Sequence, residues 1–193
     1  KGIEQMLICY GLCGSFCTVR RSLAILETLK KQNFDLLPVC SFHFCSTDTR
    51  FGSAAEHLRK IEDICEKAPI VTLRDAEPIG PKYKPELMVI APLTGNSLAK
   101  LNHGISDTPV TLAAKSHLRN NKPLLLGLAT NDGLSGNFGN LAALYGRKNV
   151  FFVPLRQDDP LQKPNSLVCD FEKIPQAVEF ALEGRQMLPL FEA

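Results

Sequence analysis

The sequence lacks the features by which membrane proteins and nucleic-acid-binding proteins are usually recognised. No apolar run in its 193 residues approaches the ~20 residues that a membrane-spanning helix needs. The formal net charge is only +2, so charge favours neither nucleic acid nor an anionic membrane as a partner. Internal repeats and low-complexity tracts are missing as well. With 45% hydrophobic and 22% charged residues, the chain is predicted to form a single globular domain over residues 1–193.

The cysteines lack the spacing of a disulfide framework. There are seven of them, an odd number spread along the chain, which favours reduced thiols and a cytoplasmic protein. Cys9, Cys13 and Cys17 recur at four-residue intervals, as metal ligands on one helix would. Here they fall on a predicted strand, a loop and a helix start, so they share no face. We predict no metal site.

Two familiar phosphate-binding fingerprints are also missing, but two other polar loops are present. No Gly-Lys-Ser/Thr follows the first glycines, and no Gly-x-Gly-x-x-Gly occurs. Instead, Gly11-Leu-Cys-Gly-Ser15 follows the apolar run 6–10, and Thr94-Gly-Asn-Ser97 follows the apolar run 87–90. A strand, a glycine loop and a helix in succession aim backbone N–H groups at an anion. The two loops together predict a phosphate-bearing ligand, although a plain strand-to-helix turn capped by Ser97 also explains the second.

Apolar strand patterns alternate with helical patterns along the whole chain. Helices are expected from near Phe16, from a capping box at Ser53, from Pro109 to about Arg119, and from 174 to 182 with a stop at Gly184. Strands are expected at residues 6–10, 34–41, 70–73, 87–92, 123–129 and 150–154, and irregular loops at 43–52, 75–85, 131–140 and 158–165. This alternation predicts a doubly wound, Rossmann-like or flavodoxin-like α/β fold, with about six parallel strands and helices on both faces.

The loops that follow the strands should lie along one rim of such a sheet, where open α/β sheets bind ligands. The polar residues expected there are Ser15, Ser41, Thr94 to Ser97, and Thr130 to Asp132. Their convergence predicts a single binding site.

A few charged and polar side chains are candidates for chemistry at this rim. Arg50 could bind a carboxylate in two places, with Asp48 orienting it or capping the turn, but it could also be an ordinary surface arginine. His43 is the histidine nearest the expected rim and could serve as an acid or base. Asn131 and Asp132 could contact the ligand, with Asp132 a further catalytic candidate, or could merely stabilise a turn. Two of the other histidines, His57 and His117, fall within helical patterns and are expected to be solvated.

At the second loop the sequence resembles a known family. Ala-Pro-x-Thr-x-Asn-Ser-Leu-Ala-Lys at 91–100, followed by Gly-Ile-x-Asp at 104–107, resembles the flavoprotein family of homo-oligomeric flavin-containing cysteine decarboxylases, and the Gly14-Ser15 loop fits it too. The resemblance implies a homo-oligomer, a trimer or a multiple of trimers, and a site for FMN. The implied FMN contacts are Gly14 and Ser15 at the phosphate, Ser41 near the ribityl chain, Thr94, Gly95, Asn96 and Ser97 as a second cradle, and Ala129 and Thr130 near the ring.

Two departures from the family pattern bear on the chemistry. The decarboxylases carry a histidine at a position that falls near Pro78 here, and proline cannot transfer a proton. They also carry Pro-Ala-Met-Asn where this chain has Leu128-Ala-Thr-Asn131, so only the asparagine is kept. Decarboxylation of a cysteine is therefore not expected.

A narrower resemblance covers the chain from end to end. Segments 47–52, 76–81, 91–97, 130–134, 157–160 and 163–168 resemble one branch of the family, made of subunits that occur in spore-forming bacteria. It implies a cytoplasmic protein of the mother cell that works with a separate NADP-binding subunit in the oxidation of a cyclic dicarboxylate. Arg50 and Asn131 would then contact the substrate. Two alternatives stay open: a free-standing FMN-dependent decarboxylase, and a non-catalytic scaffold with a vestigial flavin pocket.

Overall fold

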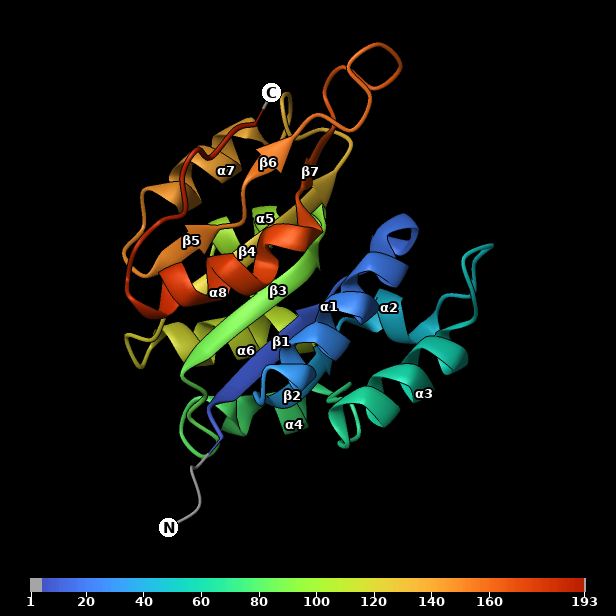
Figure 1. The fold of residues 1–193 in the computed structure, drawn as a ribbon, viewed down its shortest axis with the longest axis vertical. Helices are drawn as coiled ribbons and strands as arrows, with labels where there is room; N and C mark the ends of the chain where they lie inside the picture. The colour runs from blue at the N-terminus through green and yellow to red at the C-terminus, as the bar shows by residue number, and fades with distance from the viewer. Residues whose placement is uncertain (1–4, 193) are drawn as a thin grey trace.

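A mostly parallel sheet forms the centre of the protein, here described by a computed structural model for residues 5–192 (Figure 1). The strands are β1 (Leu7–Leu12), β2 (Asp35–Cys40), β3 (Leu87–Leu93), β4 (Leu124–Thr130), β5 (Val150–Phe152), β6 (Leu155–Arg156) and β7 (Leu167–Cys169). Five of them, in the order β2-β1-β3-β4-β5, run parallel. The short strands β7 and β6 extend the sheet antiparallel from β4. The predicted fold class is confirmed, with this antiparallel extension as an addition.

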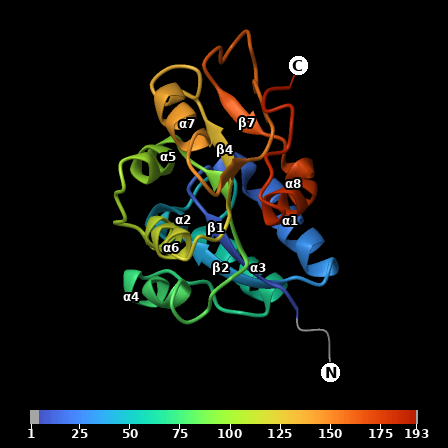
Figure 2. The ribbon, with the colours of Figure 1, turned by 90° about the vertical axis from the view of Figure 1, so that its left-hand side faces the viewer.

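Helices cover both faces of the sheet. They are α1 (Val19–Lys31), α2 (Phe42–Ser46), α3 (Ala54–Cys65), α4 (Leu73–Ala76), α5 (Gly95–Asn102), α6 (Pro109–Leu118), α7 (Phe138–Tyr145) and α8 (Ile174–Leu182), with 3-10 turns η1 (Phe16–Thr18), η2 (Glu77–Ile79) and η3 (Phe171–Lys173). Figure 2 shows α1 and α8 on one side of the strands and α4, α5, α6 and α7 on the other. None of the helices within residues 5–192 is long and apolar enough to cross a membrane.

The core follows from the sequence of the central strands. Every residue of β3 is buried, as is every residue of β4 except Thr130 at its end, because helices cover both faces. Parallel strands in this position read as continuous apolar runs, which is why the sequence located them correctly. The capping box at Ser53 and the N1 proline at Pro109 also begin helices as predicted.

Several local predictions were wrong. Residues 70–73 form no strand: only Ile70 bridges to Val39, and α4 begins at Leu73 because Thr72 caps it. The predicted loops 43–52, 75–85 and 131–140 contain most of α2, part of α4 with all of η2, and the start of α7. These helices are short, and they bury few residues, so they leave little periodicity in the sequence.

The two helical histidines are buried rather than solvated. His117 is 0% exposed, and its Nε2 lies 2.7 Å from the backbone oxygen of Pro123. His57 is 4% exposed; it packs against Phe44 and lies with Nε2 3.3 Å from the oxygen of Phe51. Each imidazole thus ties its helix to a neighbouring segment, a role that a helical pattern alone does not disclose.

Candidate functional site

The two polar loops meet at the point where the chain crosses from one half of the sheet to the other. β1 pairs with β2 on one side and with β3 on the other, so the loops after β1 and β3 are neighbours. The backbone N–H of Cys13 in the first loop donates to the oxygen of Pro92 at the end of β3, at 3.0 Å. Such a topological switch point is where open α/β sheets bind ligands. The expectation that the two loops share a rim is met.

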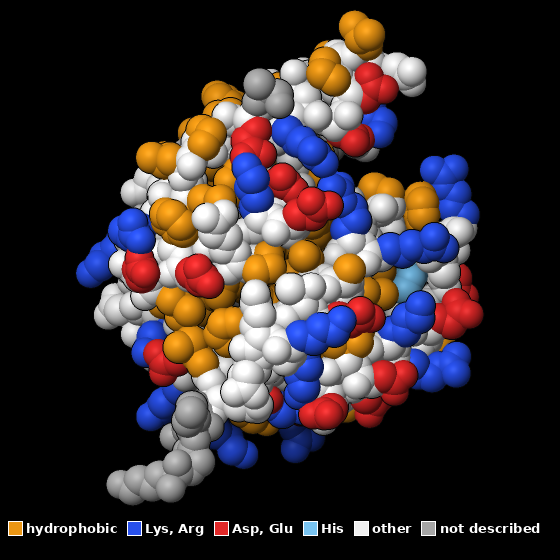
Figure 3. Space-filling model, in the orientation of Figure 1, with side chains coloured by type: hydrophobic (Ala, Val, Ile, Leu, Met, Phe, Trp, Pro, Cys, Tyr) orange, Lys and Arg blue, Asp and Glu red, His pale blue; other side chains and the backbone are white. Residues whose placement is uncertain are grey.

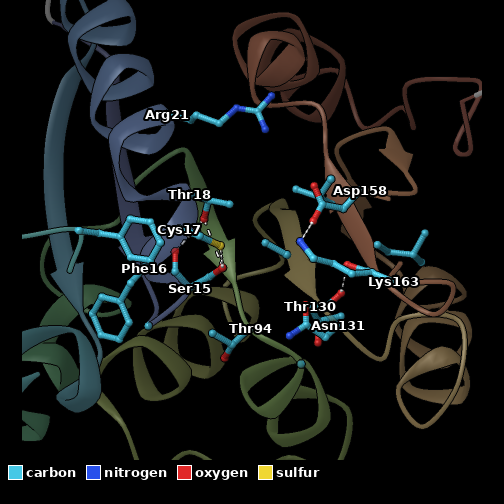
Figure 4. Close-up of a pocket in the computed structure, with 17 residues that line it drawn as sticks. Ser15, Phe16, Cys17, Thr18, Arg21, Thr94, Thr130, Asn131, Asp158 and Lys163 are labelled. Carbon is cyan, nitrogen blue, oxygen red and sulfur yellow. Dashed lines mark hydrogen bonds and ion pairs between the residues drawn. The ribbon is translucent and has the colours of Figure 1, made fainter. Parts of the chain in front are cut away.

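A cavity of about 570 Å³ opens between the first loop and the segment that joins β6 to β7 (Figure 4). Its lining combines polar, charged and a few apolar residues. The residues are Gly14, Ser15, Phe16, Cys17, Thr18, Arg21, Phe51, Thr94, Gly95, Ala129, Thr130, Asn131, Asp158, Lys163, Ser166, Leu167 and Val168. We call this the main cavity.

Figure 3 shows basic and acidic side chains interspersed over one face of the molecule, with no single sign dominating.

A second cavity of about 370 Å³ adjoins the first and shares Gly14, Phe16 and Thr94 with it. The remaining residues of this side cavity come from α2, from α5 and from the start of α6. They are Ser41, Phe42, His43, Thr47, Asn96, Ser97, Lys100, Asp107 and Thr108. Because the two cavities are contiguous at Gly14 and Thr94, a long ligand could occupy both.

The predicted flavin contacts divide between these cavities. Ser15, Gly95, Ala129 and Thr130 line the main cavity, together with the predicted substrate contact Asn131. Ser41, Asn96, Ser97 and the acid–base candidate His43 line the side cavity, and Gly14 and Thr94 line both. Thus every predicted flavin contact falls on one continuous surface.

Arg50 and Asp132 lie outside both linings. Arg50 is exposed and stacks on Phe51, with its guanidinium carbon 4.8 Å from the ring centre. Asp48 does not pair with it but accepts a hydrogen bond from the Ala54 N–H at the start of α3. Asp132 accepts hydrogen bonds from Thr130 Oγ1 at 2.5 Å and from Asn137 Nδ2 at 2.8 Å. Both carboxylate oxygens of Asp132 therefore have partners within the protein.

The hydroxyl groups at the strand ends also shape the loops. Ser41 Oγ accepts from the N–H of Phe44 at 3.4 Å and caps α2. Thr94 Oγ1 accepts from the N–H of Ser97 at 3.3 Å, so Thr94, not Ser97, is the cap of α5. A capping hydroxyl uses its oxygen as the acceptor and keeps its hydrogen for another partner. Ser41 thus retains a donor for a ligand in the side cavity.

The amide groups of the first loop are less free than the sequence suggested. Besides the bond from Cys13, the N–H of Ser15 donates to the oxygen of Cys13 at 2.8 Å. At the second loop, the N–H groups of Gly95 and Asn96 belong to the first turn of α5, where a helix offers them no internal partner. The N–H groups of Gly14 and Phe16 make no such bond within residues 5–192, so both loops offer amides to an anion, and Ser15 adds its side chain.

The thiols near the site differ in exposure. Burial raises the pKa of Cys13 to about 11, so it is a neutral thiol at physiological pH. Cys17 is exposed and lies on the main cavity, with its sulfur 4.0 Å from Ser15 Oγ. Across residues 5–192, no group of three or more His, Cys, Asp or Glu side chains is placed to hold a metal ion.

Sequence reasoning missed the charged residues of the main cavity. Arg21, on the third position of α1, and the pair Asp158 and Lys163, on the segment between β6 and β7, all line it. A signal for Arg21 was available, since the first turn of a helix that follows a binding loop lies beside that loop. No signal linked residues 158–163 to the rim, because the antiparallel strands β6 and β7 that place them were not predicted.

Comparison with known proteins agrees with this architecture. The profile of the flavoprotein family matches residues 2–173. Over 190 residues the chain is 46% identical to the B subunit of dipicolinate synthase from Bacillus subtilis (strain 168), covering 98% of this chain and 95% of that protein. The solved B subunit of dipicolinate synthase from Bacillus halodurans superposes with a TM-score of 0.90 and 40% identity, over 97% of this chain and 96% of that one.

A more distant solved structure shares the fold. The FMN-dependent cysteine decarboxylase SpaF gives a TM-score of 0.68 at 21% identity, over 93% of this chain and 96% of its own. Both the family resemblance and the narrower resemblance seen in the sequence are thus confirmed. On the evidence of the profile match and of relatives similar over nearly the whole chain, the protein belongs to the flavoprotein family.

Proposed function

We propose that this chain is the flavoprotein-type component of a dipicolinate synthase, and that it acts with the separate, NADP-binding A subunit of that enzyme to form dipicolinic acid from dihydrodipicolinate during sporulation. The observation that carries the proposal is the 46% identity to such a protein over 98% of the chain. The same similarity motivates its assignment to the cytoplasm of the mother cell. The polar, contiguous cavities at the switch point offer room for a small anionic substrate and a cofactor.

The residues at the two loops fit FMN as a bound group. Gly95 and Asn96 offer the N–H groups of a helix start, and Ser15 and Ser41 offer hydroxyls on either side of Gly14. Such donors suit a phosphate and a ribityl chain. Ser97 and Thr94 would complete the cradle, and Ala129 and Thr130 would lie near the ring. When bound, the flavin would supply a centre that accepts or donates a hydride.

The roles of the two subunits can be separated by the motif that this chain lacks. It has no dinucleotide fingerprint, so the NADP that the proposed reaction uses would bind to the A subunit. The substrate, a small dicarboxylate, would then lie near the junction of the two chains. We also expect this chain to self-associate as a trimer or a multiple of trimers, as the family resemblance implies; a relative of the same fold, a Ubix-like decarboxylase from Escherichia coli O157:H7, is dodecameric.

The test is an assay of dipicolinate formation with the two proteins taken separately and then mixed. We expect product only from the mixture, together with a flavin absorption spectrum from the purified chain or from the complex. Full activity from the NADP-binding protein alone would reject the proposal and favour the scaffold alternative. Release of carbon dioxide from cysteine-containing substrates would favour the free-standing decarboxylase alternative instead.

A further inference from the structure

We propose that Arg21, rather than Arg50, binds a carboxylate of the substrate in the main cavity. The inference rests on the proposed function for the identity of that substrate, a cyclic dicarboxylate. The role proposed for Arg21 is substrate binding and not participation in the oxidation step. Its position, its lack of an acidic partner and the groups that surround it all favour this role.

Arg21 is held in place at the wall of the main cavity. It is half-buried, on the first turn of α1, and its guanidinium carbon lies 5.2 Å from the ring centre of Phe171. Phe171 is 1% exposed, so it is a fixed platform. Stacking on an aromatic face positions a guanidinium and leaves its N–H edge free to meet an anion. In Figure 4 Arg21 extends toward the space between α1 and the segment that carries Asp158 and Lys163.

No acidic residue neutralises Arg21 in the described part of the chain. The ion pairs found within residues 5–192 are Lys30–Glu66, Lys67–Asp35, Lys100–Asp107, Lys122–Glu86, Lys163–Asp158, Lys173–Glu192 and Arg185–Glu183. Arg21 is in none of them. A half-buried cation without a partner, directed at a cavity, favours an anionic ligand there.

The rest of the lining fits a compact dicarboxylate. Lys163 and Asp158 form a pair on the opposite side, so the charged groups of the cavity wall amount to two cations and one anion. Both members of that pair are partly exposed, and such pairs contribute little stability, so Lys163 can exchange its partner for an incoming carboxylate. The amide of Asn131 lies on the same wall. Two carboxylates on one ring would thus find donors on two sides of the cavity.

Arg50 also stacks on a ring and is in none of these ion pairs, but it differs from Arg21 in position. It is exposed, it does not itself line either cavity, and the loop that carries it is fixed to α3 through Asp48 and His57. Only Phe51 of this loop reaches the main cavity. Arg50 is therefore less well placed than Arg21 to bind a ligand in the main cavity.

The experiment compares Arg21→Ala, Arg21→Lys and Arg50→Ala in the reconstituted two-subunit enzyme. Arg20→Ala is the matched control, because Arg20 is the exposed neighbour on the same helix turn and lies outside both cavities. Two quantities are measured: KM for dihydrodipicolinate, and the Kd of the product dipicolinate by calorimetry. Pyridine-2-carboxylate, with a single carboxylate, serves as the comparison ligand.

We expect Arg21→Ala to raise KM and the dipicolinate Kd by about 30-fold or more, the effect of losing a charge-assisted contact. Arg21→Lys should fall in between, because it keeps the charge but not the paired geometry. Arg20→Ala should match the parent protein, and the preference for two carboxylates over one should shrink only in the Arg21 variants. The flavin spectrum should not change, and Arg21→Ala should lower the melting temperature only by the small amount that loss of its stacking on Phe171 explains.

Four results would overturn the assignment. Parent-like KM and Kd for Arg21→Ala, in an active complex, would reject Arg21 alone and leave the proposed function standing. A rise confined to Arg50→Ala would return the role to Arg50. Loss of bound flavin in Arg21→Ala would mean that Arg21 holds the cofactor phosphate. An inactive parent complex that does not bind dipicolinate would reject the proposed function and this inference together.

Discussion

Gly95 and Thr130 lie so close together that no side chain fits between them. A Cβ built on Gly95 would come 2.5 Å from Thr130 Oγ1 and 2.6 Å from Asn137 Nδ2. These two side chains are the donors that hold the Asp132 carboxylate. The glycine of the second loop is therefore required by contact with the loop after β4, and not only by approach to a ligand.

The first prediction follows from this contact. Gly95→Ala should lower the free energy of unfolding by about 1–3 kcal/mol, because the added methyl forces the Thr130–Asp132–Asn137 cluster apart. Gly139→Ala is the control: Gly139 also lies near the start of a helix, and a Cβ there meets nothing within 4 Å. The control should be neutral or gain up to about 1 kcal/mol from helix propensity. Urea denaturation of the two variants measures both changes, and equal stabilities would contradict the packing argument.

The second prediction separates a structural role of Asp132 from an acid–base role. Asp132→Ala should lower the free energy of unfolding by about 1–3 kcal/mol, because it leaves the partly buried donors of Thr130 and Asn137 unpaired. Asp132→Asn should keep most of the stability and most of the activity of the two-subunit enzyme, because an amide can pair with both neighbours. Denaturation curves and steady-state rates are needed for each variant. An Asp132→Asn protein that is stable but inactive would restore the acid–base hypothesis.

The third prediction concerns His117 and acid. Burial lowers the pKa of His117 below its usual value of ~6.5. Between the folded-state pKa and ~6.5, the unfolded chain binds more protons than the folded chain, so stability falls as the pH is lowered through this window. One such proton contributes a slope of at most about 1.4 kcal/mol per pH unit.

The check is the free energy of unfolding between pH 5 and pH 8. His117→Gln should be less stable at pH 7 but should show a flatter decline toward pH 5 than the parent protein. His103→Gln, at an exposed histidine, is the control for replacing an imidazole by an amide. A parent-like slope in His117→Gln would assign the acid sensitivity to other groups.

The sequence predicted the part of the fold that apolar runs and helix caps determine. The buried strands β1, β3 and β4 and the capped helices α3 and α6 occupy the expected positions, because long buried strands and capping boxes depend on local sequence. The sheet order then brought Gly14 and Thr94 together. These strand-end residues were accessible to prediction because parallel topology places the ends of neighbouring strands side by side.

What the sequence could not disclose depends on contacts between distant segments. Lys163 reaches the main cavity only because β7 pairs antiparallel with β4, and β7 has three residues. Arg21 differs from Arg20 only in the direction it faces, which the helix register and Phe171 decide. His117 is buried because the segment before β4 folds over it. In each case a tertiary neighbour, absent from the local sequence, determines the outcome.

The last prediction is that this protein does not decarboxylate cysteine-containing substrates. Pro78 lies in η2, where its neighbours Glu77 and Gly80 bond to Ser116 on α6, and it lines neither cavity. A proline there can neither donate nor accept a proton. Thr130, where the decarboxylases carry methionine, is occupied with Asp132. The histidine and the methionine of the decarboxylases are therefore replaced here by Pro78 and Thr130, which lie in segments held by contacts within the protein.

The assay is carbon dioxide release from phosphopantothenoylcysteine in the presence of added FMN. We expect no release above the rate without protein, whereas an active phosphopantothenoylcysteine decarboxylase run in parallel should turn over at a normal enzymatic rate. Binding of FMN by this chain, followed spectroscopically in the same samples, excludes a missing cofactor as the cause. Turnover at or above about 1 per second would show that a group other than the one replaced by Pro78 performs the proton transfer.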